Sequence, residues 1–195
     1  MLDLQLLDRL IDLWLAEDIG HGDLTSLSMI DADADAAFVM NARQPIALAG
    51  IDVAAACFRR YDPTVCIELA AKDGDRLPAK SALMQLKGKA RSLLTVERTA
   101  LNIVQHLSGI ATETARWMDA IKGTKAKLID TRKTTPGLRA LEKHAVVCGG
   151  GAAEDHARGR FRGRCLEHHG HCDRRNNQAG GPGLRLHLRA GSGRR

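Results

Sequence analysis

The chain has 195 residues, of which 44% are hydrophobic and 3% aromatic, so we expect one ordinary domain, or one and a half small ones, around an aliphatic core. No segment approaches 18 uninterrupted apolar residues, which excludes a membrane-spanning helix. The net charge of +6 is carried by residues 152–195, with ten arginines and four acids, whereas residues 1–151 are balanced and offer no basic surface for nucleic acid.

The first ninety or so residues predict helices packed on a small antiparallel sheet. Apolar residues recur at helical spacing over residues 3–16, and a polar loop with two glycines follows at 17–25. Short apolar runs predict strands, and one alanine-rich run predicts a helix at 51–60. The predicted strands are residues 38–40, 46–49, 65–69 and 83–86.

The next part of the chain predicts the opening of a βα array. Two helices are expected at 91–107 and 111–122, separated by Ser108-Gly109. A strand at 127–130 then leads through a polar segment to a helix at 138–147. The glycines at 149–151 begin the next loop, where they form either a simple turn or a phosphate cradle.

Residues 152–195 have a different composition from the rest of the chain. They contain no Val, Ile, Met or Lys, but ten Arg, eight Gly and five of the eight His. With no sustained apolar period, such a segment buries too little surface to offset its ordering entropy. We interpret it as a frameshifted C-terminus or as a genuine disordered tail. Its Cys165 to Cys172 cluster matches no standard zinc spacing, so no metal ligand is assigned in the chain.

The polar segment DTRKTTPG, residues 130–137, is the first candidate site. Arg132 offers a planar fork for a carboxylate or phosphate, and Lys133 places a compact charge beside it. Thr131, Thr134 and Thr135 add hydroxyl and backbone donors. At the C-terminal end of a strand these groups predict a site for a small polyanion, the alternative being a solvated loop.

A second candidate lies on the helix at 91–107. Glu97 points into the middle of its apolar face and Arg98 lies at the flank of that face. A carboxylate in such a place needs a partner or stays protonated. The pair is therefore either a structural ion pair, or an arrangement in which Glu97 positions a cation and Arg98 reaches an anionic ligand.

Four stretches together resemble the quinolinate phosphoribosyltransferase family over residues 1–151. They are EDIGHGDLTS at 17–26, ERTALNIVQHLSGIAT at 97–112, DTRKTTPGLRALEKHAV at 130–146 and CGGG at 148–151. A pyrophosphorylase-like family associated with molybdate transport shares DTRKT, but the residues EKHAV and SGIAT favour the quinolinate family.

The resemblance implies an α/β fold, with an N-terminal α/β sandwich domain at 1–110 and the start of an incomplete α/β barrel at 111–151. It implies phosphoribosyl transfer from 5-phosphoribosyl 1-diphosphate to quinolinate with decarboxylation, in NAD biosynthesis, with Mg²⁺ bound to the diphosphate. It also implies a homodimer or a higher oligomer of dimers, without membrane or nucleic-acid partners. Asp3 and Asp8, where a signal peptide would be basic, favour the cytoplasm and reduced cysteines.

By the same resemblance, Arg98 is the arginine supplied across the dimer to a quinolinate carboxylate. Thr131, Arg132 and Lys133 bind substrate carboxylate and phosphate, and Lys143 adds a further cation. The family continues after the glycines with an Asn-His-Arg segment, whereas this chain reads Ala-Ala-Glu-Asp at 152–155. We therefore expect the chain as written to be incomplete and inactive, the alternative being a non-catalytic protein that dimerises and carries a basic tail.

Overall fold

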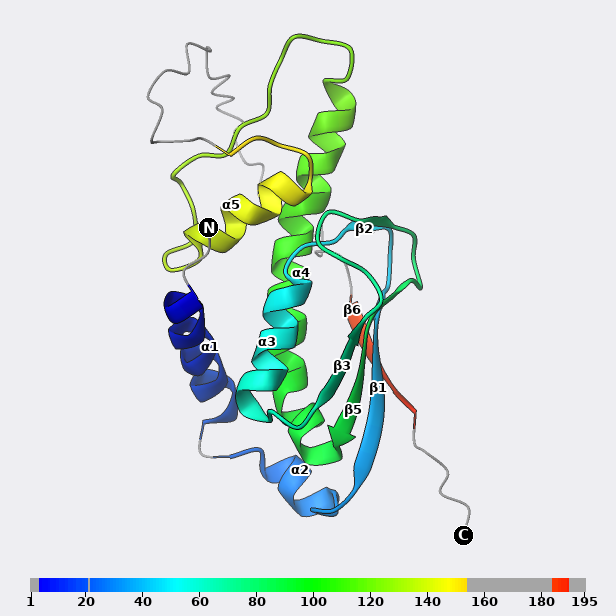
Figure 1. Cartoon of the computed structure of the whole chain (residues 1–195). Helices are drawn as coiled ribbons and strands as arrows, with labels where there is room; N and C mark the ends of the chain where they lie inside the picture. The colour runs from blue at the N-terminus through cyan, green and yellow to red at the C-terminus, as the bar shows by residue number, and fades with distance from the viewer. Residues whose placement is uncertain (1–3, 21, 154–183, 190–195) are drawn as a thin grey trace, which may run out of the picture.

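The computed structural model describes residues 4–20, 22–153 and 184–189 (Figure 1). None of the described helices combines the length and apolar character needed to cross a lipid bilayer. The elements, in chain order, are α1 (Leu4–Ile19), α2 (Leu24–Met29), β1 (Asp35–Ala42), β2 (Ile46–Ala47), α3 (Ile51–Tyr61), β3 (Cys66–Leu69), β4 (Arg76–Leu77), β5 (Ala82–Lys89), α4 (Ala90–Ala120), α5 (Arg139–Cys148) and β6 (Leu184–Arg189).

Strands β3, β5, β1 and β6 form one antiparallel sheet in that order, which confirms the predicted sheet type. In the β1–β5 pair, Phe38 lies opposite Leu86 and Met40 lies opposite Met84. All four side chains are buried, because alternate residues of a strand share a face and this face is covered by helices. Strands β2 and β4 form a separate two-stranded sheet. Strand β4 was not predicted from the sequence.

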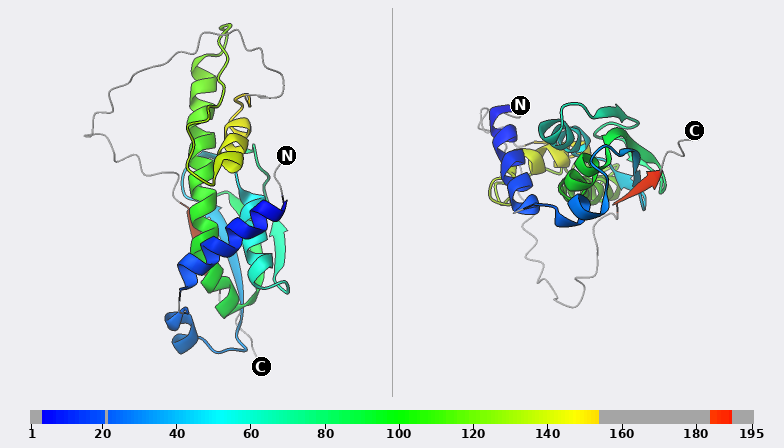
Figure 2. Two further views of the ribbon diagram at one scale, coloured as in Figure 1. Left: turned by 90° about the vertical axis from the view of Figure 1, so that its left-hand side faces the viewer. Right: turned by 90° about the horizontal axis from the view of Figure 1, so that it is seen from below.

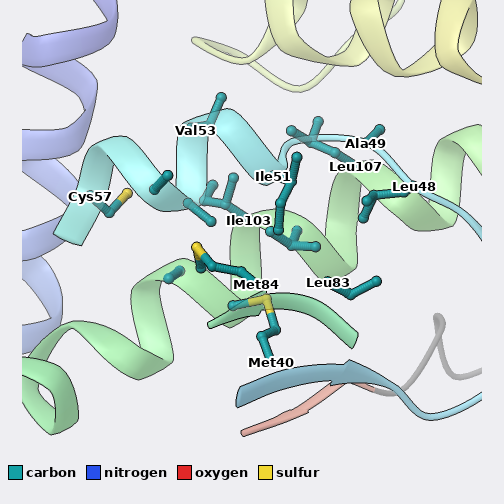
Figure 3. Close-up of a cluster of buried hydrophobic side chains, with 14 of the residues drawn as sticks. Met40, Leu48, Ala49, Ile51, Val53, Cys57, Leu83, Met84, Ile103 and Leu107 are labelled. Atoms are coloured by element: carbon teal, nitrogen blue, oxygen red, sulfur yellow. The ribbon is translucent and has the colours of Figure 1, made fainter. Parts of the chain in front are cut away.

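The core lies between the four-stranded sheet and helices α3 and α4, with α1 packed along both helices (Figures 1 and 2). Figure 3 shows Met40 and Met84 from the strands in one cluster with Ile51 of α3 and Ile103 of α4. Most members of this core are Leu, Ile, Val, Met or Ala, which confirms the aliphatic core expected from the low aromatic content.

Helix α4 runs unbroken from Ala90 to Ala120, so the predicted interruption at Ser108-Gly109 is wrong. The buried Ser108 hydroxyl accepts the Ala49 N–H at 3.1 Å and donates to the Ala49 carbonyl oxygen at 3.2 Å. A glycine inside a helix costs only about 1 kcal/mol. Burial of the α4 face on both sides of Gly109 outweighs that cost, so the helix continues.

The predicted polar loop at 17–25 is partly helical. Helix α1 continues to Ile19, and the short helix α2 begins at Leu24. Asp23 caps α2, because its carboxylate accepts the Ser26 N–H at 3.1 Å. The loop is therefore confined to the glycine-rich residues between the two helices.

Strand β6 corrects the prediction that residues 152–195 contain no regular structure. Its residues Leu184–Arg189 pair antiparallel with β1 from Ala37 to Ala42. Leucines at 184, 186 and 188 alternate with polar residues, which is the period of a strand and was overlooked in the sequence. The frameshift and disorder interpretations of 154–183 and 190–195 fall outside the described residues.

The predicted strand at 127–130 is reduced to a single parallel bridge between Ile129 and Ala152. The Asp130 N–H donates to the Ala152 carbonyl at 3.2 Å, and the Ala152 N–H donates to the Leu128 carbonyl at 2.9 Å. Helix α5 lies between the two bridged residues in sequence and packs on the upper half of α4 in Figure 1. The bridge and α5 follow the order of a strand–helix–parallel strand unit, although neither bridged residue belongs to a strand. The predicted start of an α/β barrel stays a prediction.

Gly50 provides a test of the packing between α3 and α4. Its φ is +88°, and an added Cβ would lie 2.6 Å from Leu107 Cδ1. We expect Gly50→Ala to lower the free energy of unfolding by about 2–6 kcal/mol, because left-handed strain and overpacking each cost about 1–3 kcal/mol. Gly123→Ala is the matched control, since Gly123 has φ +83° and an added Cβ would meet nothing within 4 Å. Urea unfolding measures both, and equal losses would contradict the packing argument.

Candidate functional site

The cationic loop, residues 130–137, lies between the parallel bridge and α5 and is tied to two adjacent residues of that helix. The Lys143 ammonium donates to Asp130 Oδ1, and the two side chains are only 17% and 3% exposed. Glu142 Oε2 accepts the Thr135 N–H at 3.1 Å. The loop is therefore fixed at its first residue and at Thr135, while residues 131–133 are exposed.

Glu142 also joins α5 to α4, because its Oε1 lies 2.9 Å from His106 Nε2. Burial alone would raise the pKa of Glu142, but hydrogen bonds from Thr135 and His106 outweigh it and lower that pKa. The carboxylate is thus ionised at neutral pH and accepts both bonds. Neither Glu142 nor His106 was predicted, since they lie 36 positions apart and no local pattern connects them.

Arg132 and Lys133 are exposed, and neither forms an ion pair with any residue that the structure describes. The Lys133 N–H donates to Thr131 Oγ1 at 3.1 Å, which holds the backbone in a local turn. Arg139, at the start of α5, donates from Nε to Thr134 Oγ1 at 3.2 Å and adds a guanidinium that was not predicted. A small anion here would meet several cations without displacing an existing ion pair.

Four of the five predicted substrate-binding residues therefore gather at the cationic loop: Thr131, Arg132, Lys133 and Lys143. Lys143 differs from the others because its ammonium is already bonded to Asp130. Its structural role is to anchor the loop, and its role in binding substrate stays a prediction.

Arg98, the fifth predicted residue, lies nearer the N-terminal end of α4, beside α1 and α2. Its Nη1 is 3.1 Å from Asp18 Oδ1, and its side chain remains 74% exposed. Together with Asp23 and Thr95, these residues line a polar hollow. His106 lies eight residues further along α4, about 12 Å at 1.5 Å per residue. The structure thus keeps Arg98 away from the cationic loop of its own chain.

Glu97 does not form the expected ion pair with any residue in the described part of the chain. Burial raises its pKa, and the neighbouring Arg98 only partly opposes this. The half-buried carboxyl therefore holds its proton more readily than an exposed glutamate does. The structural ion pair, one of the two interpretations of the helix pattern, is therefore not formed among the described residues, and the arrangement in which Glu97 positions a cation stays a prediction.

A second polar group, Asp73, His144 and Cys148, joins the turn between β3 and β4 to the solvent side of α5. His144 Nε2 lies 2.8 Å from Asp73 Oδ2 and 3.4 Å from Cys148 Sγ. Burial alone would raise the pKa of Asp73, but hydrogen bonds from His144, Gly50 and Ile51 lower it. The hydrogen bond to Asp73 and then that to Cys148 raise the pKa of His144 to about 10.

The fold is that of an α/β protein, and the cationic loop presents exposed cations at its surface. Residues 23–108 match the family model of the quinolinate phosphoribosyl transferase N-terminal domain, and residues 110–166 match that of its C-terminal domain. The chain belongs to the quinolinate phosphoribosyltransferase family. The second match continues past residue 151, so the boundary that we gave to the resemblance was too early.

Relatives of known sequence and structure support the same family. The chain is 45% identical to a nicotinate-nucleotide pyrophosphorylase of Mycobacterium leprae, over 70% of this chain and 49% of that protein. It is 42% identical to a probable enzyme of the same name from Bacillus subtilis, over 74% of this chain and 50% of that protein. The crystal structure of NadC from Streptococcus pyogenes superimposes with a TM-score of 0.76 and 38% identity, covering 80% of this chain and 55% of that one. The chain spans about half the length of the curated relatives it matches.

Glu142→Gln tests whether the ionised carboxylate anchors the loop. We expect the free energy of unfolding at pH 7 to fall by about 1–3 kcal/mol, because charged hydrogen bonds to Thr135 and His106 are weakened. Hydrogen exchange at the Thr135 amide should become faster. Glu113→Gln is the control, since Glu113 forms only an exposed pair with Arg116.

The pH dependence provides a second readout of the same variant. Because the pKa of Glu142 is lowered on folding, its contribution to stability is present above its unfolded pKa and is lost as the pH falls through the folded pKa. The native chain should therefore lose stability in acid more steeply than the Glu142→Gln chain. Parallel stability curves for the two chains would show that Glu142 is not a charged anchor.

Proposed function

We propose that this protein acts in phosphoribosyl transfer from 5-phosphoribosyl 1-diphosphate to quinolinate, with loss of CO₂ and formation of nicotinate mononucleotide and pyrophosphate. The observation that carries the proposal is the cationic loop, in which Arg132 and Lys133 are exposed and unpaired among the described residues while the loop itself is fixed by α5. Both substrates are polyanions, which suits this arrangement. The relatives are named nicotinate-nucleotide pyrophosphorylases, which supports the same reaction rather than the molybdate-associated alternative.

The chemistry that the loop supplies is electrostatic. Arg132 is suited to hold a carboxylate or phosphate through two parallel hydrogen bonds, and Lys133 adds a point charge. As CO₂ leaves, negative charge develops on the pyridine ring carbon, and fixed cations stabilise it without covalent catalysis. The Thr131 hydroxyl already accepts the Lys133 N–H, which orients the backbone between the two cations.

Arg98 enters the proposal through a second copy of the chain. Arg98 is separated from the cationic loop along α4, yet its guanidinium is largely exposed. A homodimer, or a higher oligomer of dimers, would let Arg98 of one subunit reach the substrate held by the other. The same proposal treats residues 1–110 and 111–151 as the two domains and places the protein in the cytoplasm, where the free thiols of Cys57, Cys66 and Cys148 are stable.

Mg²⁺ belongs to this proposal as an ion that arrives with the diphosphate. The two acids at the loop are already engaged, Asp130 by Lys143 and Glu142 by Thr135 and His106. Mg²⁺ commonly binds proteins through substrate phosphates, and there it neutralises the charge of the leaving pyrophosphate. The described residues of the loop therefore fit a magnesium–diphosphate ligand better than a resident metal ion.

Binding measurements test the cationic loop directly. We expect Arg132→Ala and Lys133→Ala each to weaken pyrophosphate or quinolinate binding at least about tenfold, because a charge-assisted contact is lost. Lys125→Ala is the control, since Lys125 is exposed in the preceding turn. Isothermal titration of the full chain measures all three, and affinities unaffected by Arg132→Ala would remove that residue from the site.

Turnover tests the reaction itself. The 195-residue chain should release no CO₂ from quinolinate, because the Asn-His-Arg segment of the family is replaced by other residues after Gly151. A chimera that continues residues 1–151 with the corresponding remainder of the Bacillus subtilis relative should release CO₂, and Arg132→Ala should reduce that rate at least about tenfold. An inactive but folded chimera would count against the proposed reaction, whereas activity of the unmodified chain would overturn only the expected incompleteness.

A further inference from the structure

Asp73, His144 and Cys148 place three metal-ligating atoms around one point, outside the cationic loop. The carboxylate oxygen, the imidazole Nε2 and the thiol sulfur all lie within 4.8 Å of one another. They come from two separate parts of the fold, the turn after β3 and the last turns of α5. The described residues contain no other such group.

The geometry differs from that of a nucleophilic Cys-His-Asp triad. In a triad the carboxylate bonds one ring nitrogen and the nucleophile bonds the other. Here Asp73 Oδ2 and Cys148 Sγ both approach the same nitrogen of His144, at 2.8 Å and 3.4 Å. A single Nε2 proton can point well at only one of them, whereas a metal ion is a shared centre for all three donors.

The separations are close to those of a tetrahedral zinc site. Ligand bonds of about 2.0–2.3 Å at tetrahedral angles place neighbouring donors about 3.3–3.7 Å apart. The observed nitrogen–sulfur distance of 3.4 Å already falls in this range, and the nitrogen–oxygen distance of 2.8 Å needs to open by about half an ångström. His144 is exposed and Cys148 is partly buried, and both side chains have rotatable bonds along which this change would take place.

The two residues on α5 and the carboxylate of Asp73 are each positioned to act as metal ligands. His144 and Cys148 are four residues apart on α5, so they lie on one helix face and can chelate together. The Asp73 carboxylate is held from behind, since Gly50 N–H donates to Oδ2 and Ile51 N–H donates to Oδ1, each at 3.0 Å. Such hydrogen bonds orient a ligating carboxylate in metal sites.

We propose that Asp73, His144 and Cys148 bind one divalent ion of the zinc class, with a fourth position left to water. Thiolate and imidazole donors suit Zn²⁺ and Co²⁺ and disfavour Mg²⁺, so this site is chemically distinct from a magnesium–diphosphate site. The inference does not rest on the proposed phosphoribosyl transfer.

The bound ion would fasten α5 to the N-terminal half of the protein. Asp73 belongs to the turn between β3 and β4, while α5 also carries Glu142 and Lys143, the two anchors of the cationic loop. Metal occupancy would therefore reduce movement of α5 and, through it, of the loop.

Cobalt binding to the full, metal-free chain tests the proposal. We expect one Co²⁺ per chain with a thiolate-to-cobalt charge-transfer band, which disappears in Cys148→Ser. His144→Gln should weaken Co²⁺ binding at least about tenfold, in keeping with the loss of a direct ligand. Zn²⁺ should displace the cobalt, and Mg²⁺ in large excess should not. Zn²⁺ should also slow hydrogen exchange in α5 of the native chain but not of the Cys148→Ser chain.

Two controls separate this site from the other thiols. Cys66→Ser alters an exposed free cysteine and should leave the band unchanged. Cys165→Ser/Cys172→Ser removes the thiols of the C-terminal Cys/His cluster and should also leave one band-forming site. A band retained in Cys148→Ser, a band lost only with Cys165 and Cys172, or no cobalt uptake tighter than about 100 μM would each overturn the proposal.

Discussion

The continuous burial of α4 is the constraint on which the rest of the structure depends. Its apolar face is buried from Leu93 to Ala115, first against the sheet and α3 and then against α5. A single helix of this length spans both parts of the fold, so residues on it keep fixed separations. Arg98 near one end and His106 near the middle are therefore positioned by the same packing, although they serve different polar contacts.

The distribution of ion pairs around the cationic loop explains how cations remain available there. The nearby acids bond inward, Asp130 to Lys143 and Glu142 to Thr135 and His106. Because these acids are bonded to groups that hold the loop, they do not pair with Arg132 or Lys133, which stay exposed to solvent. Two adjacent cations in water repel each other only weakly, because the high dielectric and salt screen them. A site can thus keep its positive charge for a ligand at little cost in stability.

The sequence was informative where a residue's role is set by its neighbours in the chain. Helical spacing located α1, α3 and α5, and short apolar runs located β1 and β5 within a few residues. Local rules failed at Ser108-Gly109, because the hydroxyl partner of Ser108 is the backbone of Ala49, 59 positions away. They also missed the alternating leucines of β6, whose arginine-rich surroundings obscured a strand period.

The candidate site was predictable only where neighbouring residues in the chain define it. Arg132 and Lys133 were proposed because two adjacent cations directly after a predicted strand are conspicuous in the sequence. The family resemblance then suggested a ligand for them. Glu142 and Asp73 were missed because their partners are brought together only by tertiary packing, with Asp73 and His144 separated by 71 positions. The cations of a motif can be identified from the sequence, but the groups that hold the motif in place cannot.

The two parts of the fold are held together by different interactions. Among the described residues, the buried apolar side chains that follow Ala115 are only Leu141 and Ala145, both on α5. The stretch from the end of α4 to Ala152 therefore adds little to the hydrophobic core, and polar contacts fix its position. Segments with few buried apolar contacts open at a lower free energy than the core does. Glu142 and His144 consequently matter more to the geometry of the cationic loop than their small buried area suggests, because their bonds to His106 and Asp73 connect α5 to the part of the protein that packs tightly, while Lys143 ties the loop to α5.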